Sequence, residues 1–276
     1  MKRLTLLLVL ITVLIFPLKY PFAAGPSSKT MIFAGAGSNL AITRILAVAF
    51  TKTHPGVTIN IPESIGSTGG IRAVSEEAVT IGLSSRPFRE QEKKLVLEVA
   101  PYARTLIVIG VHPGVADDDI TFEEIVQIYR GKKTNWKNGR NIIVLTRNKG
   151  ESTIDVMEQL IPGFRKANDE SLQARRWIVA FIDQDMNRLL MTTPDAIGMS
   201  DLGTIKSEHL NIKMLKVNGI SPNPENVIKG SYVLVKTLYF VFKKDKLPPE
   251  AKAFMDFVRS KQGQKILKEN GYLSGK

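Results

Sequence analysis

Three loops rich in small residues each lie between an expected strand and an expected helix. They occupy residues 35–39 (GAGSN), 66–70 (GSTGG) and 150–153 (GEST). The first turn of a helix presents about four N–H groups without intrahelical partners, together with a partial positive charge. Glycine lets the backbone approach an anion closely, and serine and threonine hydroxyls add further donors. If these helix starts converge, they form a site for a phosphate-sized oxyanion.

Arg147 adds to this interpretation, because it follows an expected strand and lies three residues before the third loop. Its planar guanidinium can bind two oxygens of one oxyanion at the same time. The alternative is that the glycine, serine and threonine residues of these loops only cap the helices, which is an ordinary role at helix starts. The residues by themselves leave both explanations open.

The loops depend on an alternation of short apolar strands and amphipathic helices. Strands are expected at residues 30–34, 57–61, 80–83, 105–111, 142–145, 196–199 and 231–242. Helices are expected after each of the three loops, the first capped by Ser38, and after a capping box formed by Thr121 and Glu124. A further amphipathic helix carries Phe254 and Phe257. This order predicts an α/β fold with a mostly parallel sheet covered by helices.

The composition limits the chemistry. The 276 residues include no cysteine, which excludes disulfides, thiolate metal sites, a cysteine nucleophile and a lipidated N-terminal cysteine. The 38 Lys and Arg outnumber the 26 Asp and Glu, so the formal net charge is +12, and a basic surface attracts anions. These cations are scattered, and no nucleic-acid-binding motif is present. We therefore expect a small anionic ligand and no nucleic-acid partner.

The N-terminal segment has the features of a secretory signal peptide. Lys2 and Arg3 precede an apolar run at residues 4–16, and small residues follow at 23–25. The run is short for a membrane span, which takes about 20 residues. An uncleaved signal anchor is the alternative. We expect cleavage near residue 25 and a soluble mature protein that is exported to the periplasm.

No catalytic motif is present. The sequence lacks a G-x-S-x-G elbow, an H-E-x-x-H motif and a P-loop lysine, and its three histidines are far apart. Asp183 and Asp185 are either metal ligands or members of an ordinary polar loop or helix cap, and we favour the second. We expect no enzyme activity, no cofactor and no metal. A phosphate-ester hydrolase is the least favoured alternative.

The order of the segments resembles the phosphate-binding, substrate-binding proteins of ABC transporters. The resemblance is carried by GAGSNL (35–40), IGSTGGI (65–71), TIGLSSRP (80–87), IYRGKKTNW (128–136), TRNKGEST (146–153), AIGMSDLG (196–203), ENVIKGSYVLVKTLYFVF (225–242) and FVRSKQGQKILKENGY (257–272). It covers nearly all of the chain after the leader. It implies a type II periplasmic binding protein fold, in which two α/β lobes with mixed, mostly parallel sheets enclose a tetrahedral oxyanion in the cleft between them.

The resemblance also implies how the chain is divided and what it does. Residues 1–25 would be the signal peptide, residues 26–106 and 233–276 the first lobe, and residues 107–232 the second lobe. The exported monomer would capture an inorganic oxyanion, with phosphate as the first choice, for the membrane permease of an ABC importer. Molybdate, tungstate, sulfate or a phosphonate as the ligand, and a membrane sensor instead of the permease, are the alternatives.

Carried over position by position, the resemblance implies a set of contacts with the anion. They are Asn39, Leu40 through its backbone, Ser67, Ser85, Arg147, Glu151, Ser152 and Thr153. The family usually has an Asp at the position of Ser85, and that acid accepts a hydrogen bond from a protonated phosphate oxygen and rejects sulfate. Glu151 departs from the family's GSGT loop, so it either replaces this acid or points outward from the helix. For Arg86 we favour a surface charge over a second anion contact.

Overall fold

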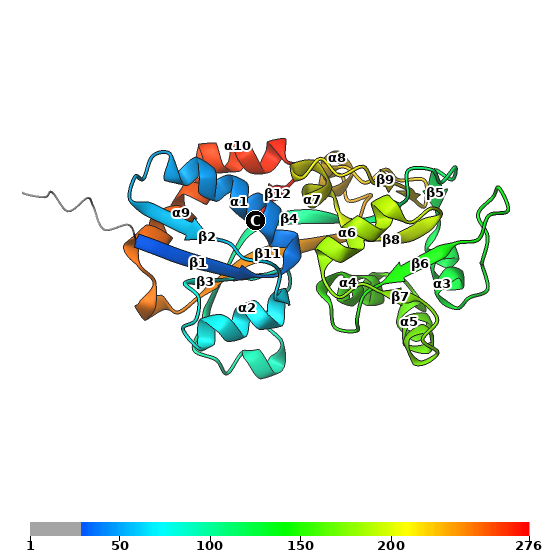
Figure 1. Cartoon of the computed structure of the whole chain (residues 1–276), viewed down its shortest axis with the longest axis horizontal. Coiled ribbons are helices and arrows are strands. Elements are labelled where there is room, and N and C mark those ends of the chain that lie inside the picture. Colours follow the sequence, from blue (N-terminus) through cyan, green and yellow to red (C-terminus); the bar gives the residue numbers. More distant parts are fainter. Residues whose placement is uncertain (1–28, 276) are drawn as a thin grey trace, which may run out of the picture.

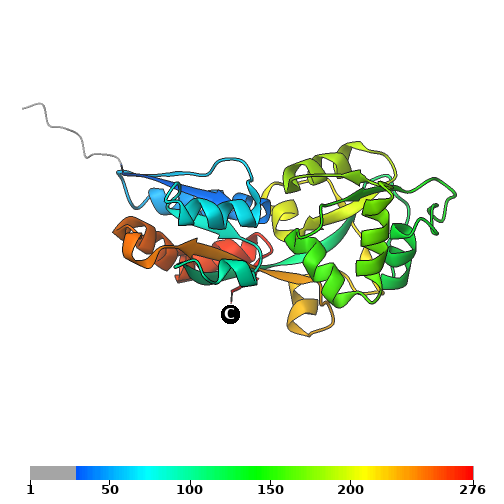
Figure 2. The ribbon, with the colours of Figure 1, turned by 90° about the horizontal axis from the view of Figure 1, so that it is seen from below.

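The computed structural model describes residues 29–275, so the expected signal peptide at residues 1–25 lies outside the described residues. Two bodies lie side by side along the long axis and are joined in the middle by strands (Figure 1 and Figure 2). Within residues 29–275, no helix combines the length and the apolarity that crossing a bilayer requires.

The two bodies share one mixed sheet. The strands along its path are, in order across the sheet, β2 (Val57–Asn60), β1 (Lys29–Gly35), β3 (Ile81–Ser84), β11 (Val235–Phe242), β4 (Glu98–Val111), β8 (Ala196–Asp201), β6 (Ile143–Thr146) and β7 (Ile178–Val179). Pairing is parallel among β1, β2 and β3 and among β6, β7 and β8. The central strands β4 and β11 run antiparallel to their neighbours on this path. The expected mixed, mostly parallel sheet is therefore confirmed, with the parallel pairs in the outer strands of each body and the antiparallel pairs at the centre.

Short strands complete the pairing. β9 (Lys213–Met214) and β12 (Leu273–Ser274) pair with β4 outside the main path. β5 (Asp119–Ile120) and β10 (Lys216–Val217) form a separate two-stranded sheet.

The helices follow the strands in the α/β order that the sequence predicts. They are α1 (Gly37–Thr51), α2 (Gly66–Ser75), α3 (Phe122–Tyr129), α4 (Ser152–Leu160), α5 (Phe164–Gln173), α6 (Asp183–Thr192), α7 (Leu202–Ser207), α8 (Pro224–Ile228), α9 (Pro249–Arg259) and α10 (Lys261–Glu269), with short 3₁₀ turns η1 (Glu90–Glu92) and η2 (Lys244–Lys246). The capping box of α3 is confirmed, because the Glu124 N–H donates to Thr121 Oγ1 and the Thr121 N–H donates to the Glu124 carboxylate. The predicted cap of α1 is wrong: the helix begins at Gly37, so Ser38 lies inside its first turn.

Two separate hydrophobic cores account for the two bodies. One core takes its buried side chains from residues 31–103 and 238–272, and the other takes them from residues 106–234. The change between cores falls within β4, which pairs with β11 as far as Leu106 and with β8 from Ile107 onward. Strands β4 and β11 therefore connect the two bodies.

Gly70 shows how closely α2 packs on the sheet. A methyl group added to Gly70 would lie 2.8 Å from the Ala34 carbonyl oxygen and 3.0 Å from that of Leu83. The helix therefore rests directly on the backbones of β1 and β3. This close approach brings Ser67 to the end of β3, where its hydroxyl accepts a hydrogen bond from the Ser85 N–H.

We expect Gly70→Ala to lower the free energy of unfolding by about 1–3 kcal/mol, because the new methyl group would push against rigid backbone. Gly69→Ala is the matched control in the same helix. Its methyl group would meet a side chain instead of backbone, lying 3.1 Å from the Cβ of Ile65, which is 49% exposed. The control should change the free energy of unfolding by less than about 1 kcal/mol in either direction. Chemical denaturation measures both variants, and equal stabilities would contradict the tight packing of α2.

Candidate anion-binding site

The three predicted loops lie at the starts of α1, α2 and α4. No hydrogen bond from a helix N–H reaches the side chain of Ala36, Ile65 or Glu151, the residues in the N-cap positions. The serine and threonine residues of these loops are therefore not N-caps, which contradicts the purely structural alternative. Their hydroxyls are left for other partners.

Hydroxyl groups from two of these loops and from the end of β3 meet in one place. Ser85 Oγ lies 3.3 Å from Ser67 Oγ and 2.8 Å from Ser152 Oγ, and all three residues are buried. Ser67 and Ser85 belong to the body that contains α1 and α2, whereas Ser152 begins α4 in the other body. This chain of hydroxyls therefore brings together expected ligand residues from both sides.

Asn39 is held so that its amide group is free to donate. Its Oδ1 accepts a hydrogen bond of 2.8 Å from the hydroxyl of Tyr102, whose pKa is raised by burial. Asn39 is completely buried, and its Nδ2 has no partner among residues 29–275. The hydroxyl of Ser38, which is 1% exposed, lies beside the Asp201 carboxyl group and opposes the rise of its pKa. Leu40 packs its side chain into the first core, so only its backbone is left for a ligand.

Arg147 follows β6 and is 4% exposed. Its Nη2 donates to Glu151 Oε2 at 3.0 Å and lies 3.8 Å from Asp183 Oδ2. Its Nη1 is buried and has no partner within the described part of the chain. A buried N–H group of a cation is costly to leave unpaired, so this nitrogen is the strongest single indication of an anion at this place.

Two carboxylates face the Arg147 guanidinium. Glu151 turns toward it, so the alternative in which this side chain points outward is wrong. Asp183, the first residue of α6, packs against the first loop: a methyl group on Gly37 would lie 2.4 Å from Asp183 Oδ2. Asp185 pairs with Arg188 on the surface of the same helix. Within residues 29–275, no cluster of three or more acidic, histidine or cysteine side chains could hold a metal ion.

Lys236 and Asp201 were not recognised as site residues from the sequence. Lys236 Nζ donates to Thr153 Oγ1 at 2.9 Å and lies 3.0 Å from Asp201 Oδ1. Both charged residues are 3% exposed. Burial raises the pKa of Asp201, the Lys236 ammonium opposes this rise, and Asp183 adds to it. A lysine inside the apolar run VLVKTLYFVF was the one available signal, because lysine is almost never fully buried unless it is paired.

Arg86 is buried, so the prediction that it is a surface charge is wrong. It is 6% exposed, and its two terminal nitrogens each lie 2.7 Å from an oxygen of Glu92. It also donates to Thr68 Oγ1 at 2.8 Å. Burial opposes the ionisation of Glu92, but hydrogen bonds from Arg86 and the Arg89 N–H outweigh it, so the pKa of Glu92 lies below 4.5. Arg86 therefore supports the second loop as a buried ion pair.

Arg89 also links the two bodies. Its guanidinium donates to the Gly150 carbonyl oxygen and lies 3.1 Å from Asp155 Oδ2. A pocket of about 350 Å³ opens beside these contacts, and Ser85, Ser152 and Lys236 are among its lining residues. This pocket gives the hydroxyl chain an approach from solvent.

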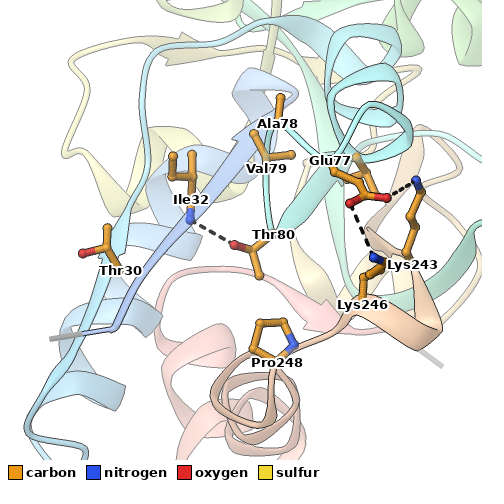
Figure 3. Close-up of a pocket in the computed structure, with 10 residues that line it drawn as sticks. Thr30, Ile32, Glu77, Ala78, Val79, Thr80, Lys243, Lys246 and Pro248 are labelled. Carbon is orange, nitrogen blue, oxygen red and sulfur yellow. Dashed lines mark hydrogen bonds and ion pairs between the residues drawn. The ribbon is translucent and has the colours of Figure 1, made fainter. Parts of the chain in front are cut away.

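A second pocket, of about 290 Å³, lies in the first body and is lined by other residues (Figure 3). Its two cations, Lys243 and Lys246, both face the Glu77 carboxylate, at 2.9 and 3.9 Å. Their hydrogen bond and charges lower the pKa of Glu77, which is therefore ionised at neutral pH. Because its cations are already paired, this pocket is a poor candidate for the anion site.

The fold places the chain in a known superfamily. The family model for the PBP superfamily domain matches residues 21–262. The chain therefore belongs to this superfamily, and the expected two-lobed α/β fold is confirmed by similarity to solved structures.

The relatives in this superfamily that the chain resembles carry a consistent name. The phosphate-binding protein PstS of Borreliella burgdorferi is 22% identical over 272 residues, which covers 96% of this chain and 97% of that protein. The phosphate-binding protein PstS of Bacillus subtilis is 25% identical over 254 residues, covering 90% of this chain and 81% of that protein.

Two solved structures show the likeness in three dimensions. A putative phosphate ABC transporter substrate-binding protein from Clostridium perfringens, with bound phosphate, has a TM-score of 0.79 and 27% identity, covering 90% of this chain and 100% of that chain. An ABC-type phosphate transport receptor from Vibrio cholerae has a TM-score of 0.63 and 24% identity, covering 88% of this chain and 99% of that chain. The second likeness is a similarity of fold alone.

The Arg86–Glu92 ion pair makes the free energy of unfolding depend on pH. Because the pKa of Glu92 is lowered in the folded protein, the stabilisation is present above the ordinary value of 4.5 and is lost as the pH falls below it. We expect Glu92→Gln to lower the unfolding free energy by about 2–4 kcal/mol at neutral pH. The difference from the unsubstituted protein should shrink in acid.

Denaturation at a series of pH values measures this difference. Glu98→Gln is the control, because Glu98 is exposed and has no ion pair among the described residues; it should change stability by less than about 0.5 kcal/mol at any pH. A Glu92→Gln deficit that stayed constant down to about pH 3, well below the ordinary carboxyl pKa, would contradict this account.

Proposed function

We propose that this chain is a phosphate-binding solute-binding protein that captures phosphate for an ABC importer. The observation that carries the proposal is a pair of buried donors without partners among residues 29–275: Asn39 Nδ2 and Arg147 Nη1. They come from the first turn of α1 and the end of β6. An oxyanion accepts hydrogen bonds at every oxygen, so a phosphate satisfies such donors together.

The remaining contacts follow from the same geometry. Ser67, Ser85 and Ser152 contribute the linked hydroxyls, and Thr153 adds another from the first turn of α4. Glu151 and the backbone of Leu40 complete the set expected from the sequence. The first turns of α1 and α4 add N–H groups and their partial positive charge.

The two hydrophobic cores support a division into two lobes. We assign residues 26–106 and 233–276 to the first lobe and residues 107–232 to the second, with β4 and β11 as the connections. Phosphate would lie between the lobes, where Ser85 meets Ser152. Binding by residues of both lobes favours the closed arrangement.

The biological setting is part of the proposal. A signal peptide at residues 1–25 would export the chain, and the mature protein would deliver phosphate to a membrane permease as a monomer, without a nucleic-acid partner. The relatives named above are called binding proteins and transport components. These names support a role in binding rather than catalysis.

Arg147 provides the main test. We expect Arg147→Met to weaken phosphate binding by at least about thirtyfold, because it removes charge-assisted hydrogen bonds worth about 2 kcal/mol. Isothermal titration with phosphate measures the effect. Arg165→Met, which removes a largely exposed arginine in the same lobe, is the control and should leave the affinity unchanged. Unaltered affinity in Arg147→Met would refute the proposed site.

The carboxylate beside Arg147 leads to a prediction about selectivity. Hydrogen phosphate carries an O–H group that can donate a hydrogen bond to a carboxylate, whereas sulfate carries no proton near neutral pH and is repelled. We expect Glu151→Gln to reduce the preference for phosphate over sulfate by about tenfold, or about 1.4 kcal/mol. Parallel titrations with both anions test this, with the exposed Glu123→Gln as the control. An unchanged preference would remove Glu151 from anion selection, and Asp183→Asn is then the next variant.

A further inference from the structure

Lys236 is an unusual residue for its position. It lies on β11, one of the two strands that connect the bodies, and its register partner on β4 is Thr105. Its neighbours on the strand are mostly apolar, yet its ammonium is buried with a side-chain exposure of 1%. Replacing a buried ion pair with well-packed hydrophobic residues is often neutral or stabilising. Stability therefore does not explain why a lysine and an aspartate occupy this place.

The hydrogen-bond chemistry gives Lys236 a specific effect on Thr153. An ammonium group has three donors and no acceptor. In the 2.9 Å contact between the two residues, Lys236 Nζ must donate and Thr153 Oγ1 must accept. The single proton of the Thr153 hydroxyl is then free to be donated elsewhere. Lys236 thus fixes this threonine as a hydrogen-bond donor.

The donor state matters because Thr153 lies in the site. It follows Ser152, whose hydroxyl is 2.8 Å from that of Ser85 in the other body. Thr153 is 7% exposed, so water has little access to its hydroxyl. A free hydroxyl proton in this place is suited to an anion, which offers only acceptors.

Asp201 fixes the position of the Lys236 ammonium group. It is the last residue of β8, and its Oδ1 lies 3.0 Å from Lys236 Nζ. The carboxylate therefore compensates the buried charge and holds the ammonium between Asp201 and Thr153. The contact with Asp201 is an ion pair, and the hydrogen bond of the ammonium is the one to Thr153 Oγ1.

We propose that Lys236 is a positioning residue for the bound oxyanion, held by Asp201 and acting through the hydroxyl of Thr153. Besides the charge of Arg147, it also places a second positive charge close to the ligand, separated from it only by the Thr153 hydroxyl. This inference rests on the proposed function, because it assumes that the anion binds beside Thr153. Lys236 itself does not touch the anion.

A double-mutant cycle with phosphate as the probe tests the coupling. Lys236→Met removes the donor, and Thr153→Val removes the hydroxyl while keeping the shape. We expect each single variant to weaken phosphate binding by about tenfold. The double variant should bind about as weakly as the weaker single variant, because both remove the same hydrogen bond to the anion. Lys236→Arg, which retains the charge and the donors, should recover part of the affinity.

Controls separate this role from a structural one. Thr153→Ser keeps the hydroxyl and should retain more affinity than Thr153→Val, and the exposed Lys216→Met should bind like the unsubstituted protein. If Lys236→Met does not fold, Lys236→Met combined with Asp201→Asn removes both buried charges and takes its place. Thermal unfolding without phosphate records the stability of every variant.

The outcomes are distinct. A lower melting temperature with unchanged phosphate affinity, or fully additive losses in the cycle, would make Lys236 a structural residue and overturn this proposal alone. Absence of phosphate binding by the unsubstituted protein would overturn the proposed function and this proposal with it. Shared, non-additive losses together with partial recovery in Lys236→Arg would support the positioning role.

Discussion

A guanidinium that is removed from water needs partners for its N–H groups, and the protein provides only some of them for Arg147. Its Nη2 faces Glu151, while its Nη1 is buried without a partner among residues 29–275. The Asn39 amide nitrogen is in the same condition. A folded protein leaves few such groups unpaired. The proposed phosphate would supply acceptor oxygens for both groups.

The positions of these donors depend on how the two bodies are joined. β4 changes partner from β11 to β8 between Leu106 and Ile107, so a continuous strand belongs to both cores. Near this connection, Ser85 contacts Ser152, and Arg89 contacts Gly150. Each side therefore holds part of the site on its own rigid core. A rotation about the connecting strands would separate the donors, which is how a ligand between the bodies favours closure.

The charges around the site balance attraction against selectivity. Arg147 and Lys236 supply positive charge, but Glu151, Asp183 and Asp201 lie close to them. An arrangement with so many carboxylates is poorly suited to a ligand that is fully ionised and carries no proton. It suits one that also donates a hydrogen bond. In the proposed function, the binding energy would depend on directed hydrogen bonds as well as on net charge.

The sequence by itself determined the α/β order, the three helix starts and the position of Arg147 directly after a strand. These features depend on local periodicity, turn residues and a family resemblance. It predicted a mixed sheet without placing the antiparallel strands at the centre, and it did not predict the burial of Arg86 against Glu92. Only the tertiary structure brought Asp183 to Gly37 and Lys236 to Thr153. The physical reason is that these contacts join segments far apart in the chain. Local patterns specify where an element forms, whereas packing decides which side chains lose water together and must pair.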